Sequence, residues 1–237
     1  MIQLRDFSIG YGTRQLLGNI NVDIESGRLT ALIGRNGAGK STLLRAIAGL
    51  NGNYSGKIII DGNDIRVMPA WLKARTLAFV STQRIRIANL RCEDVVAMGR
   101  APYTNWIGHL QESDRDIVAS ALEAVGMTDY ASRTMDSMSD GECQRIMIAR
   151  ALAQATPVIL LDEPTSFLDL TNRYELCALL ARLAHQGNKC ILFSTHELHT
   201  AMELCDDIAV IDTPHITCTQ VGNDKTTALL RCLFPHF

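Results

Sequence analysis

The sequence lacks any apolar run long enough to cross a membrane. Its most apolar stretches, such as Val158–Leu161, are far shorter than the ~20 residues that a transmembrane helix needs. The N-terminal segment MIQLRDFSIGYGTRQLL also lacks the apolar core and the small-residue cleavage site of a signal peptide. We therefore expect a soluble, intracellular protein that would reach a membrane only through a partner.

The sequence also lacks an excess of charge of either sign. Its 237 residues include 23 Lys and Arg and 25 Asp and Glu, which gives a formal net charge of −2 at pH 7. This balance provides no general attraction to nucleic acid or to an anionic membrane surface, although it allows a local basic patch. We expect no nucleic-acid partner.

The cysteines form no metal-binding or redox motif. No two are spaced C-x-x-C, none clusters with histidines, and their number is odd. Disulfides are rare in the reducing cytosol, so this pattern predicts free thiols. The seven are Cys92, Cys143, Cys177, Cys190, Cys205, Cys218 and Cys232.

The first part of the chain is patterned for strands. A stretch with helical spacing, Lys40–Leu50, lies among short alternating runs of apolar and polar residues, so we predict a β-rich lobe around one helix. The alternating runs are Ile2–Ile9, Ile20–Ile24, Leu29–Ile33 and Lys57–Ile60.

Strand signals vanish between Cys92 and Ala153, and helical spacing takes their place. We therefore expect a helical subdomain at residues 91–153, inserted between residues 1–90 and 154–237 of a single domain. The stretches with helical spacing are Cys92–Met98, Ser113–Val125 and Gly141–Ala153.

Strand signals return after this segment. The alternation of strand and helix predicts parallel strands joined by crossovers. The expected elements are strands at Val158–Leu161, Cys190–Ser194 and Asp207–Ile211, and a helix at Leu170–Gln186. The segment after Asp212 has too little pattern to assign.

The strongest single feature is Gly34-Arg-Asn-Gly-Ala-Gly-Lys-Ser-Thr42, which matches G-x-x-x-x-G-K-[ST]. It follows an expected strand and opens an expected helix, the context in which backbone N–H groups and a helix N-terminus bind phosphate. The alternative is a glycine-rich turn that matches the motif by chance, and such a turn would not need a strand before it and a helix after it. Lys40 would supply charge to the β- and γ-phosphates, and Ser41 a hydroxyl to Mg²⁺. The predicted phosphate-binding residues are Gly34, Asn36, Gly37, Gly39, Lys40, Ser41 and Thr42.

A second feature is Val158-Ile-Leu-Leu-Asp-Glu163. Continuous aliphatic residues are typical of a buried parallel strand, and ligands bind beyond the carboxyl ends of such strands. We therefore predict that Asp162 holds Mg²⁺ and that Glu163 polarises the water that attacks the γ-phosphate. Taken alone, Asp162 and Glu163 would be interpreted as acidic residues that cap a helix. Because the sequence also contains a phosphate loop, we favour the catalytic interpretation.

The segment Met138-Ser-Asp-Gly-Glu-Cys-Gln-Arg145 resembles the L-S-G-G-Q signature motif of ABC ATPases. Further elements fall in that family's order. They are Tyr11 as the adenine-stacking aromatic, Gln83 as the Q-loop glutamine, Glu163 as the catalytic glutamate, Ser166-Phe-Leu-Asp169 as the D-loop and His196 as the switch histidine.

The resemblance covers the chain to about Ile211. It implies an α/β fold: a P-loop NTPase core with a mostly parallel sheet, an antiparallel β lobe and a helical signature-motif subdomain. It also implies that Glu163, His196 and Gln83 act in catalysis. Mg²⁺ would be held by Ser41, Gln83 and Asp162. The ATP of a second copy of the chain would contact Ser139, Gly141, Glu142 and Asp169 in a head-to-tail dimer.

The signature segment has its own physical logic. Ser139-x-x-Glu142 is a capping box, so a helix is expected to begin there with free N–H groups and the Ser139 hydroxyl facing a phosphate. Asp140 replaces the family's first glycine, and its carboxylate should repel a triphosphate unless it turns away. This departure bears on the rate of hydrolysis. For Cys143, one turn further on, we expect ordinary packing.

The spacing also indicates which kind of ABC ATPase this is. The chain has no long coiled coil between phosphate loop and signature helix, as DNA-repair relatives have, and no second ATPase half, as translation factors have. The resemblance implies a separate, peripheral subunit on the cytoplasmic face of the cell membrane, docked on polytopic permease subunits through a groove near Gln83. A substrate-binding protein would act indirectly.

Other segments resemble the branch that imports iron-siderophores, haem and cobalamin. They are Glu93–Tyr103, Trp106, Asp114, Ala121–Gly126, Ala151–Gln154 and Thr165–Leu170. The cargo itself is not encoded in an ATPase subunit. A soluble ATP switch for iron–sulfur assembly or signalling would share every catalytic residue and differ only in its partner. A P-loop kinase or GTPase would leave the Ser139 motif and His196 unexplained.

Overall fold

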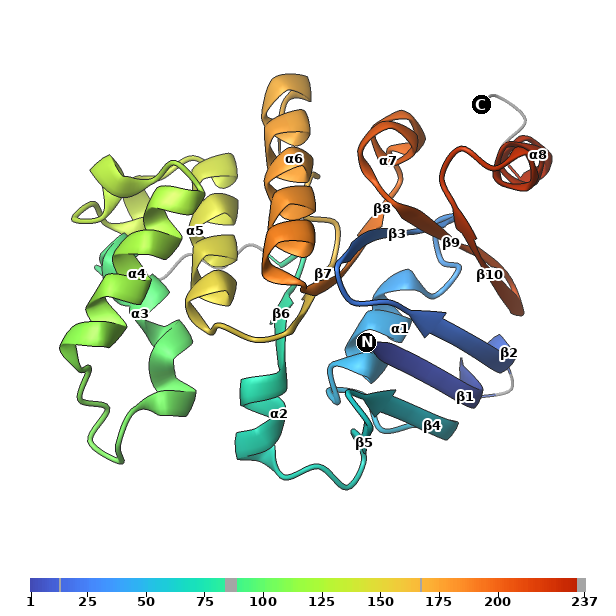
Figure 1. Ribbon diagram of the computed structural model, residues 1–237, viewed down its shortest axis with the longest axis horizontal. Coiled ribbons are helices and arrows are strands. Elements are labelled where there is room, and N and C mark those ends of the chain that lie inside the picture. The colour runs from blue at the N-terminus through green and yellow to red at the C-terminus, as the bar shows by residue number, and fades with distance from the viewer. Residues whose placement is uncertain (13, 84–88, 167, 234–237) are drawn as a thin grey trace.

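The computed structural model describes residues 1–12, 14–83, 89–166 and 168–233. Two sheets lie side by side, with helices around them and a group of helices to one side (Figure 1). The expected α/β fold, with a mostly parallel sheet and a separate antiparallel sheet, is confirmed. In the described part of the chain, no helix is both long and apolar enough to span a membrane.

The antiparallel sheet has the strand order β2-β1-β4-β5. Inward-facing aliphatic residues of β1, such as Ile2 and Leu4, pack with Leu43 and Leu44 of helix α1 in one hydrophobic core. This confirms the predicted β-rich lobe around one helix, except that the run Leu29–Ile33 belongs to the second sheet. The elements are β1 (Ile2–Tyr11), β2 (Arg14–Ile24), α1 (Lys40–Ile47), β4 (Tyr54–Ile60) and β5 (Asn63–Asp64).

The second sheet has the order β10-β9-β3-β8-β7-β6, and every neighbouring pair is parallel except β9 and β10. Because β3, β8 and β7 are neighbours, the loops that follow their carboxyl ends converge at one edge. The strands are β3 (Arg28–Gly34), β6 (Leu77–Val80), β7 (Val158–Leu161), β8 (Cys190–Thr195), β9 (Asp207–Asp212) and β10 (His215–Gln220).

The helices at the left of Figure 1 pack on one another: α3 and α4 each contact α5. Together with parts of the central sheet they share a second hydrophobic core. They are α3 (Cys92–Ala97), η1 (Met98–Tyr103), α4 (Glu112–Ala124), η2 (Thr128–Tyr130), η3 (Met135–Ser137) and α5 (Asp140–Ala153). The remaining helices are α2 (Ala70–Thr76), α6 (Leu170–Gly187), α7 (Leu198–Leu204) and α8 (Asp224–Leu233).

One helix boundary was predicted wrongly, and one segment had no prediction. Helix α1 ends at Ile47 rather than Leu50, because Gly49 adopts a left-handed conformation with φ +71 and the Leu50 N–H donates to the carbonyl of Arg45. The segment after Asp212, left unassigned, forms edge strand β10 and helix α8. An edge strand with partly exposed, mostly polar residues gives a weak pattern.

The cysteine prediction is confirmed where it can be checked. The free thiols are Cys92, Cys143, Cys177, Cys190, Cys205 and Cys218. The side chain of Cys232 lies outside the described residues. Burial raises the pKa of Cys177 and of Cys190 to about 11, so both are protonated, unreactive thiols at neutral pH.

A buried ion pair joins η1 to α4. Nε of Arg100 donates to Oδ1 of Asp114 at 2.9 Å, and Nη1 of Arg100 donates to the carbonyl of Ala153 at 2.7 Å. The backbone N–H of Gln111 donates to Oδ2 of Asp114 at 3.0 Å. That N–H, and next the Arg100 guanidinium, lower the pKa of Asp114. Residues noted for their resemblance to an importer branch thus form a structural contact.

We expect Asp114→Asn to lower the Tm at pH 7 by several degrees, because it leaves the buried Arg100 guanidinium without its counter-charge. The folded-state pKa of Asp114 lies below the unfolded value. The contribution of ionised Asp114 to the free energy of unfolding is therefore complete above its unfolded-state pKa, at pH ~4. It is lost as the pH falls through the folded-state pKa. Thermal melts from pH 7 to pH 3 would show the variant converging on the parent; a constant difference would contradict the assignment.

Candidate functional site

The phosphate loop leaves the carboxyl end of β3 and enters α1. Gly37 and Gly39 adopt φ +78 and +103, a region that side-chain-bearing residues rarely occupy, and a Cβ on Gly39 would lie 3.3 Å from Leu16. The sequence therefore needs glycine at both positions to curl the backbone at the helix N-terminus.

Lys40 points into this loop. Its Nζ donates to the carbonyl of Gly34 at 2.8 Å, and the residue is only 6% exposed. Burial lowers the pKa of Lys40, and the carboxylates of Glu163 and Asp162 act in the opposite direction. The ammonium group is thus a buried positive charge facing two acidic groups, ready to exchange a carbonyl for a phosphate oxygen.

Asp162 is held at the end of β7 by hydroxyl groups from neighbouring segments. The hydroxyls of Ser41 and Ser194 both donate to its Oδ1, at 2.9 and 2.7 Å, and the Thr82 hydroxyl donates to its carbonyl oxygen at 2.9 Å. Asp162 is buried at 2% exposure. The structure thus brings Ser41 and Asp162 into direct contact, as the sequence predicted for two residues of one site.

Glu163 follows in an unusual backbone conformation. Its φ of +48 is left-handed, which a residue with a side chain adopts only when its surroundings hold it there. The Glu163 N–H donates to Oγ of Ser194 at 2.8 Å, and the Ser166 hydroxyl donates to Oε2 of Glu163 at 3.1 Å. Ser41 and Ser194 therefore hold the carboxylate of Asp162, whereas Ser166 holds that of Glu163, which lines the cavity.

A cavity of about 510 Å³ opens above the phosphate loop. It collects predicted residues from separate parts of the chain: the β1–β2 hairpin, the loop before α1 and the end of β7. Its lining is Tyr11, Arg14, Leu16, Asn36, Gly37, Gly39, Lys40, Ser41, Thr42 and Glu163. Gly34 lies below this lining at the base of the loop, where a Cβ would come within 3.1 Å of Ile211.

The mouth of the cavity carries an aromatic and a cation. Tyr11 is 60% exposed, and its hydroxyl lies 3.3 Å from Oγ1 of Thr42, so the ring spans the entrance. Arg14 follows in the same hairpin and was missed by the sequence analysis, although a basic residue close to Tyr11 was a usable signal. An exposed ring beside a guanidinium suits a flat heterocycle attached to phosphates.

Gln83 and His196 stand apart from the cavity lining. Gln83 is exposed at the end of a described segment, next to the Thr82 that bonds Asp162. His196 is exposed after β8, and its Nε2 lies 3.4 Å from Oε1 of Glu197. β8 pairs with β7, so His196 follows the strand next to the one that leads to Asp162.

The capping box at the start of α5 is confirmed. The Ser139 N–H and hydroxyl both donate to Oε2 of Glu142, at 2.8 and 2.7 Å, and the Glu142 N–H donates back to Oγ of Ser139 at 3.3 Å. These bonds, the hydroxyl first, lower the pKa of Glu142. The Cys143 side chain is buried, as expected for packing.

This helix start is not part of the cavity. α5 lies on the far side of β7 and α6 from α1 (Figure 1), and none of Ser139, Gly141 and Glu142 lines the cavity. Asp169 caps α6, accepting from the Asn172 N–H at 2.8 Å. The neighbouring Phe167, part of the predicted D-loop, lies outside the described residues. Within one chain, the start of α5 and the cavity are therefore separate.

A phosphate loop at the end of β3, acidic residues at the end of β7 and a cavity between them define the chain as a P-loop ATPase. More narrowly, it belongs to the ABC transporter family, whose model matches residues 17–166. An iron(3+)-hydroxamate import ATP-binding protein of Bacillus subtilis is 36% identical over 200 residues, or 84% of this chain and 74% of that protein.

Solved structures agree. A chain of a metal-chelate type ABC transporter in an inward-facing conformation has a TM-score of 0.85 and 28% identity, covering 99% of this chain and 88% of its own. A dimeric bacterial ABC transporter cassette has a TM-score of 0.83 and 25% identity, covering 94% of this chain and 100% of its own. The chain is thus the ATP-binding, ATP-hydrolysing component of an ABC transporter.

Proposed function

We propose that this chain binds ATP in the cavity above the phosphate loop and uses its hydrolysis to drive a separate membrane permease. The observation that carries the proposal is the convergence of Lys40, Ser41 and Glu163 on one cavity, with Asp162 bonded to Ser41. The adenine would stack on Tyr11. The phosphates would lie on the N–H groups of the loop, whose partial positive charge suits them.

The residues beside Lys40 fit a magnesium ion. A serine hydroxyl and an aspartate carboxylate, 2.9 Å apart, are the hard oxygen ligands that Mg²⁺ prefers. We assign Ser41 and Asp162 to hold it with the phosphates, joined by Gln83 when its loop approaches. When bound, the ion would neutralise charge that develops on the phosphates.

In this proposal Glu163 is the catalytic carboxylate. It lines the cavity without being sealed in, so it can accept a proton from a water aligned with the γ-phosphate. His196 would donate a hydrogen bond to the γ-phosphate from the end of β8, and Gln83 would help to orient the water. Neither residue lines the cavity, so both would approach it when nucleotide binds.

A second copy of the chain would complete each site. The N-terminus of α5, capped by Ser139, carries a partial positive charge that suits a phosphate, yet it lies away from its own cavity. We therefore assign Ser139, Gly141, Glu142 and Asp169 to the ATP held by a partner copy in a head-to-tail dimer, consistent with the dimeric cassette it resembles. Each ATP carries four negative charges, and its attraction to both chains would hold the dimer together. Hydrolysis would weaken that attraction.

Substitution of Asp140 provides a test of this dimer assignment. Asp140 is the first residue of α5 and partly buried beside Ser139, so its negative charge would lie near a partner's phosphates even if the side chain turns away from them. We expect Asp140→Gly and Asp140→Asn to hydrolyse ATP as fast as the parent or several-fold faster, because a repulsive charge leaves the interface. Steady-state phosphate release at two salt concentrations would check this. A large loss in both variants would show that the carboxylate has a positive role.

For the cargo, we propose iron-siderophore, haem or cobalamin-type chelates, delivered to the permease by a substrate-binding protein. The supporting similarities are to an iron(3+)-hydroxamate importer and a metal-chelate type transporter. Residues 91–153 would form the helical subdomain that meets the permease at the cytoplasmic face of the cell membrane, and residues 1–90 and 154–237 the nucleotide-binding core.

The test is a pull-down of tagged Glu163→Gln protein with Mg-ATP from detergent-solubilised membranes, with bound proteins identified by mass. A polytopic membrane protein in equal amount would support the transporter assignment. Wild-type protein without nucleotide serves as the control. If only soluble proteins were captured, the ATPase chemistry would stand and the permease proposal would fail.

A further inference from the structure

We propose that Arg173 and Glu197 are positioning residues that hold the loop before α6 and the loop after β8 in one fixed relation. Nε of Arg173 donates to the carbonyl of Leu168 at 2.9 Å, and Nη1 of the same guanidinium donates to Oε1 of Glu197 at 2.6 Å. That Glu197 oxygen also lies 3.4 Å from Nε2 of His196. The inference rests on the proposed function, because that function gives His196 its role.

The geometry of this contact requires an arginine. A planar guanidinium presents several N–H groups in fixed directions, so one side chain can hold a backbone carbonyl and a carboxylate simultaneously. A lysine would keep the charge but not the fork. The Arg173 and Glu197 side chains are 25% and 31% exposed, so water screens this ion pair in part. Its main effect is on where the two loops lie.

Further hydrogen bonds anchor Glu197 and the start of α6. The Glu197 N–H donates to Oγ1 of Thr195, the last residue of β8, at 3.0 Å. Across the first turn of α6, the Arg173 N–H donates to the carbonyl of Asp169 at 3.0 Å, and Nδ2 of Asn172 donates to Oδ1 of Asp169 at 2.8 Å. Thus Arg173, through Glu197, connects the D-loop residue Asp169 to the switch histidine.

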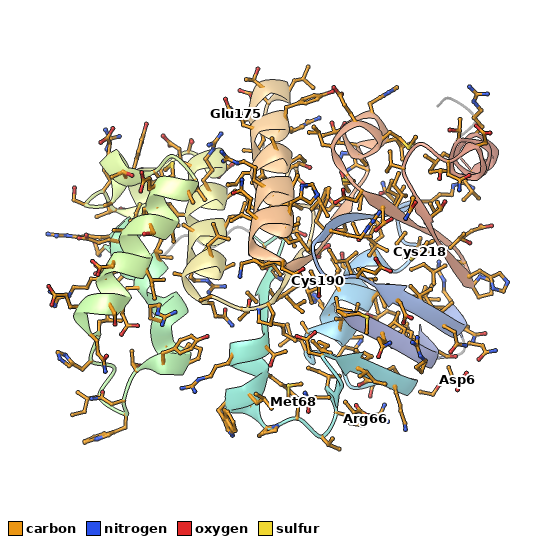
Figure 2. All side chains as sticks on the ribbon, viewed as in Figure 1. Asp6, Arg66, Met68, Glu175, Cys190 and Cys218 are labelled. Atoms are coloured by element: carbon orange, nitrogen blue, oxygen red, sulfur yellow. The ribbon has the colours of Figure 1, made fainter. Side chains whose placement is uncertain are left out.

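The network also reaches the signature helix. Arg145 of α5 donates to Oδ1 of Asn172 at 2.5 Å and pairs with Glu175 of α6 at 2.9 Å; Figure 2 labels Glu175 on this helix. Nη1 of Arg145 donates to the carbonyl of Val125 at 3.2 Å. Hydrogen bonds therefore run without a break from α5, across the first turns of α6, to the loop that carries His196.

In the proposed dimer this path joins the two nucleotides. Ser139 at the start of α5 would face the partner's ATP, whereas His196 would face the ATP of its own chain. Arg173 lies on the path between Ser139 and His196, and its ion pair with Glu197 can form or break. It can therefore shift the position of His196 in response to what α5 and the D-loop contact in the partner. The structure assigns to Arg173 and Glu197 the alignment of His196, rather than nucleotide binding.

The experiment compares Arg173→Lys, Glu197→Gln and the double variant, with Arg5→Lys as control because Arg5 forms an exposed ion pair with Asp23 in the antiparallel sheet. We expect kcat for ATP to fall roughly tenfold in each single variant, since small misplacements of catalytic groups are costly. KM and Tm should be almost unchanged. The double variant should be no slower than the singles, because the two residues act as one unit.

A His196→Ala background separates this inference from the proposed function. There, Arg173→Lys and Glu197→Gln should have no further effect on kcat. If His196→Ala hydrolyses ATP at the parental rate, the role proposed for His196 fails. If it is slow but both positioning variants keep the parental kcat with His196 present, only the present inference fails. Losses of kcat that persist in the His196→Ala background would equally overturn it.

Discussion

Glu163→Gln is expected to abolish almost all ATP hydrolysis and leave nucleotide binding intact. Glutamine has the same shape, can accept the Ser166 hydroxyl bond, and leaves the backbone N–H on Ser194. It cannot take a proton from water. Loss of a general base lowers the rate by about 100-fold to 10,000-fold. The variant should therefore accumulate as an ATP-bound dimer.

Three measurements check this expectation: phosphate release, binding of a fluorescent ATP analogue, and elution volume on size exclusion with and without Mg-ATP. Glu123→Gln, an exposed position on α4, is the matched control. Hydrolysis at the parental rate would show that Glu163 is not the base. Lost nucleotide binding would instead show that the Glu163 carboxylate is needed for binding as well as for hydrolysis.

The second large effect is expected from Lys40. Removing its ammonium group should weaken ATP binding by about 10-fold to 100-fold, the value of a hydrogen bond to a charged group. Loss of the cation also leaves Glu163 and Asp162 unopposed, and both would repel the phosphates. Lys40→Met keeps most of the side-chain volume, and Lys40→Ala removes it.

Titration with a fluorescent ATP analogue measures the effect, and Lys57→Ala, an exposed lysine of β4, controls for general loss of charge. The two Lys40 variants should behave alike, since the charge rather than packing is at stake. Parental affinity in either, with an unchanged melting curve, would refute the phosphate-loop assignment.

The elements that sequence analysis predicted well are those with strong periodicity or fixed local chemistry. β7 was located because a strand buried on both faces is continuously aliphatic, and α5 because Ser139 and Glu142 form a capping box. β10 and α8 were missed. β10 is placed by its pairing with β9, which leaves no local pattern in a mostly polar edge strand, whereas α8 has an amphipathic pattern that the interpretation of the sequence overlooked.

The same limit applies to the site. The phosphate loop and Asp162 follow from motifs, whereas Ser194 and Arg173 do not. Ser194 matters because β8 happens to be next to β7, which places its hydroxyl between two acidic residues. Arg173 matters because the first turn of α6 ends near the loop after β8. Such roles arise from contacts between distant segments, and a single sequence does not specify these.

The separation of the α5 start from the cavity has a genetic consequence. If each ATP needs the loop of one chain and Ser139 of another, a chain defective only at Ser139 would still bind nucleotide and still pair. It would form dimers with intact chains, and one ATP site of each such dimer would lack Ser139. In a cell that carries both alleles, the defective copy would therefore reduce transport by more than its share of the protein, and the mutation would behave as dominant.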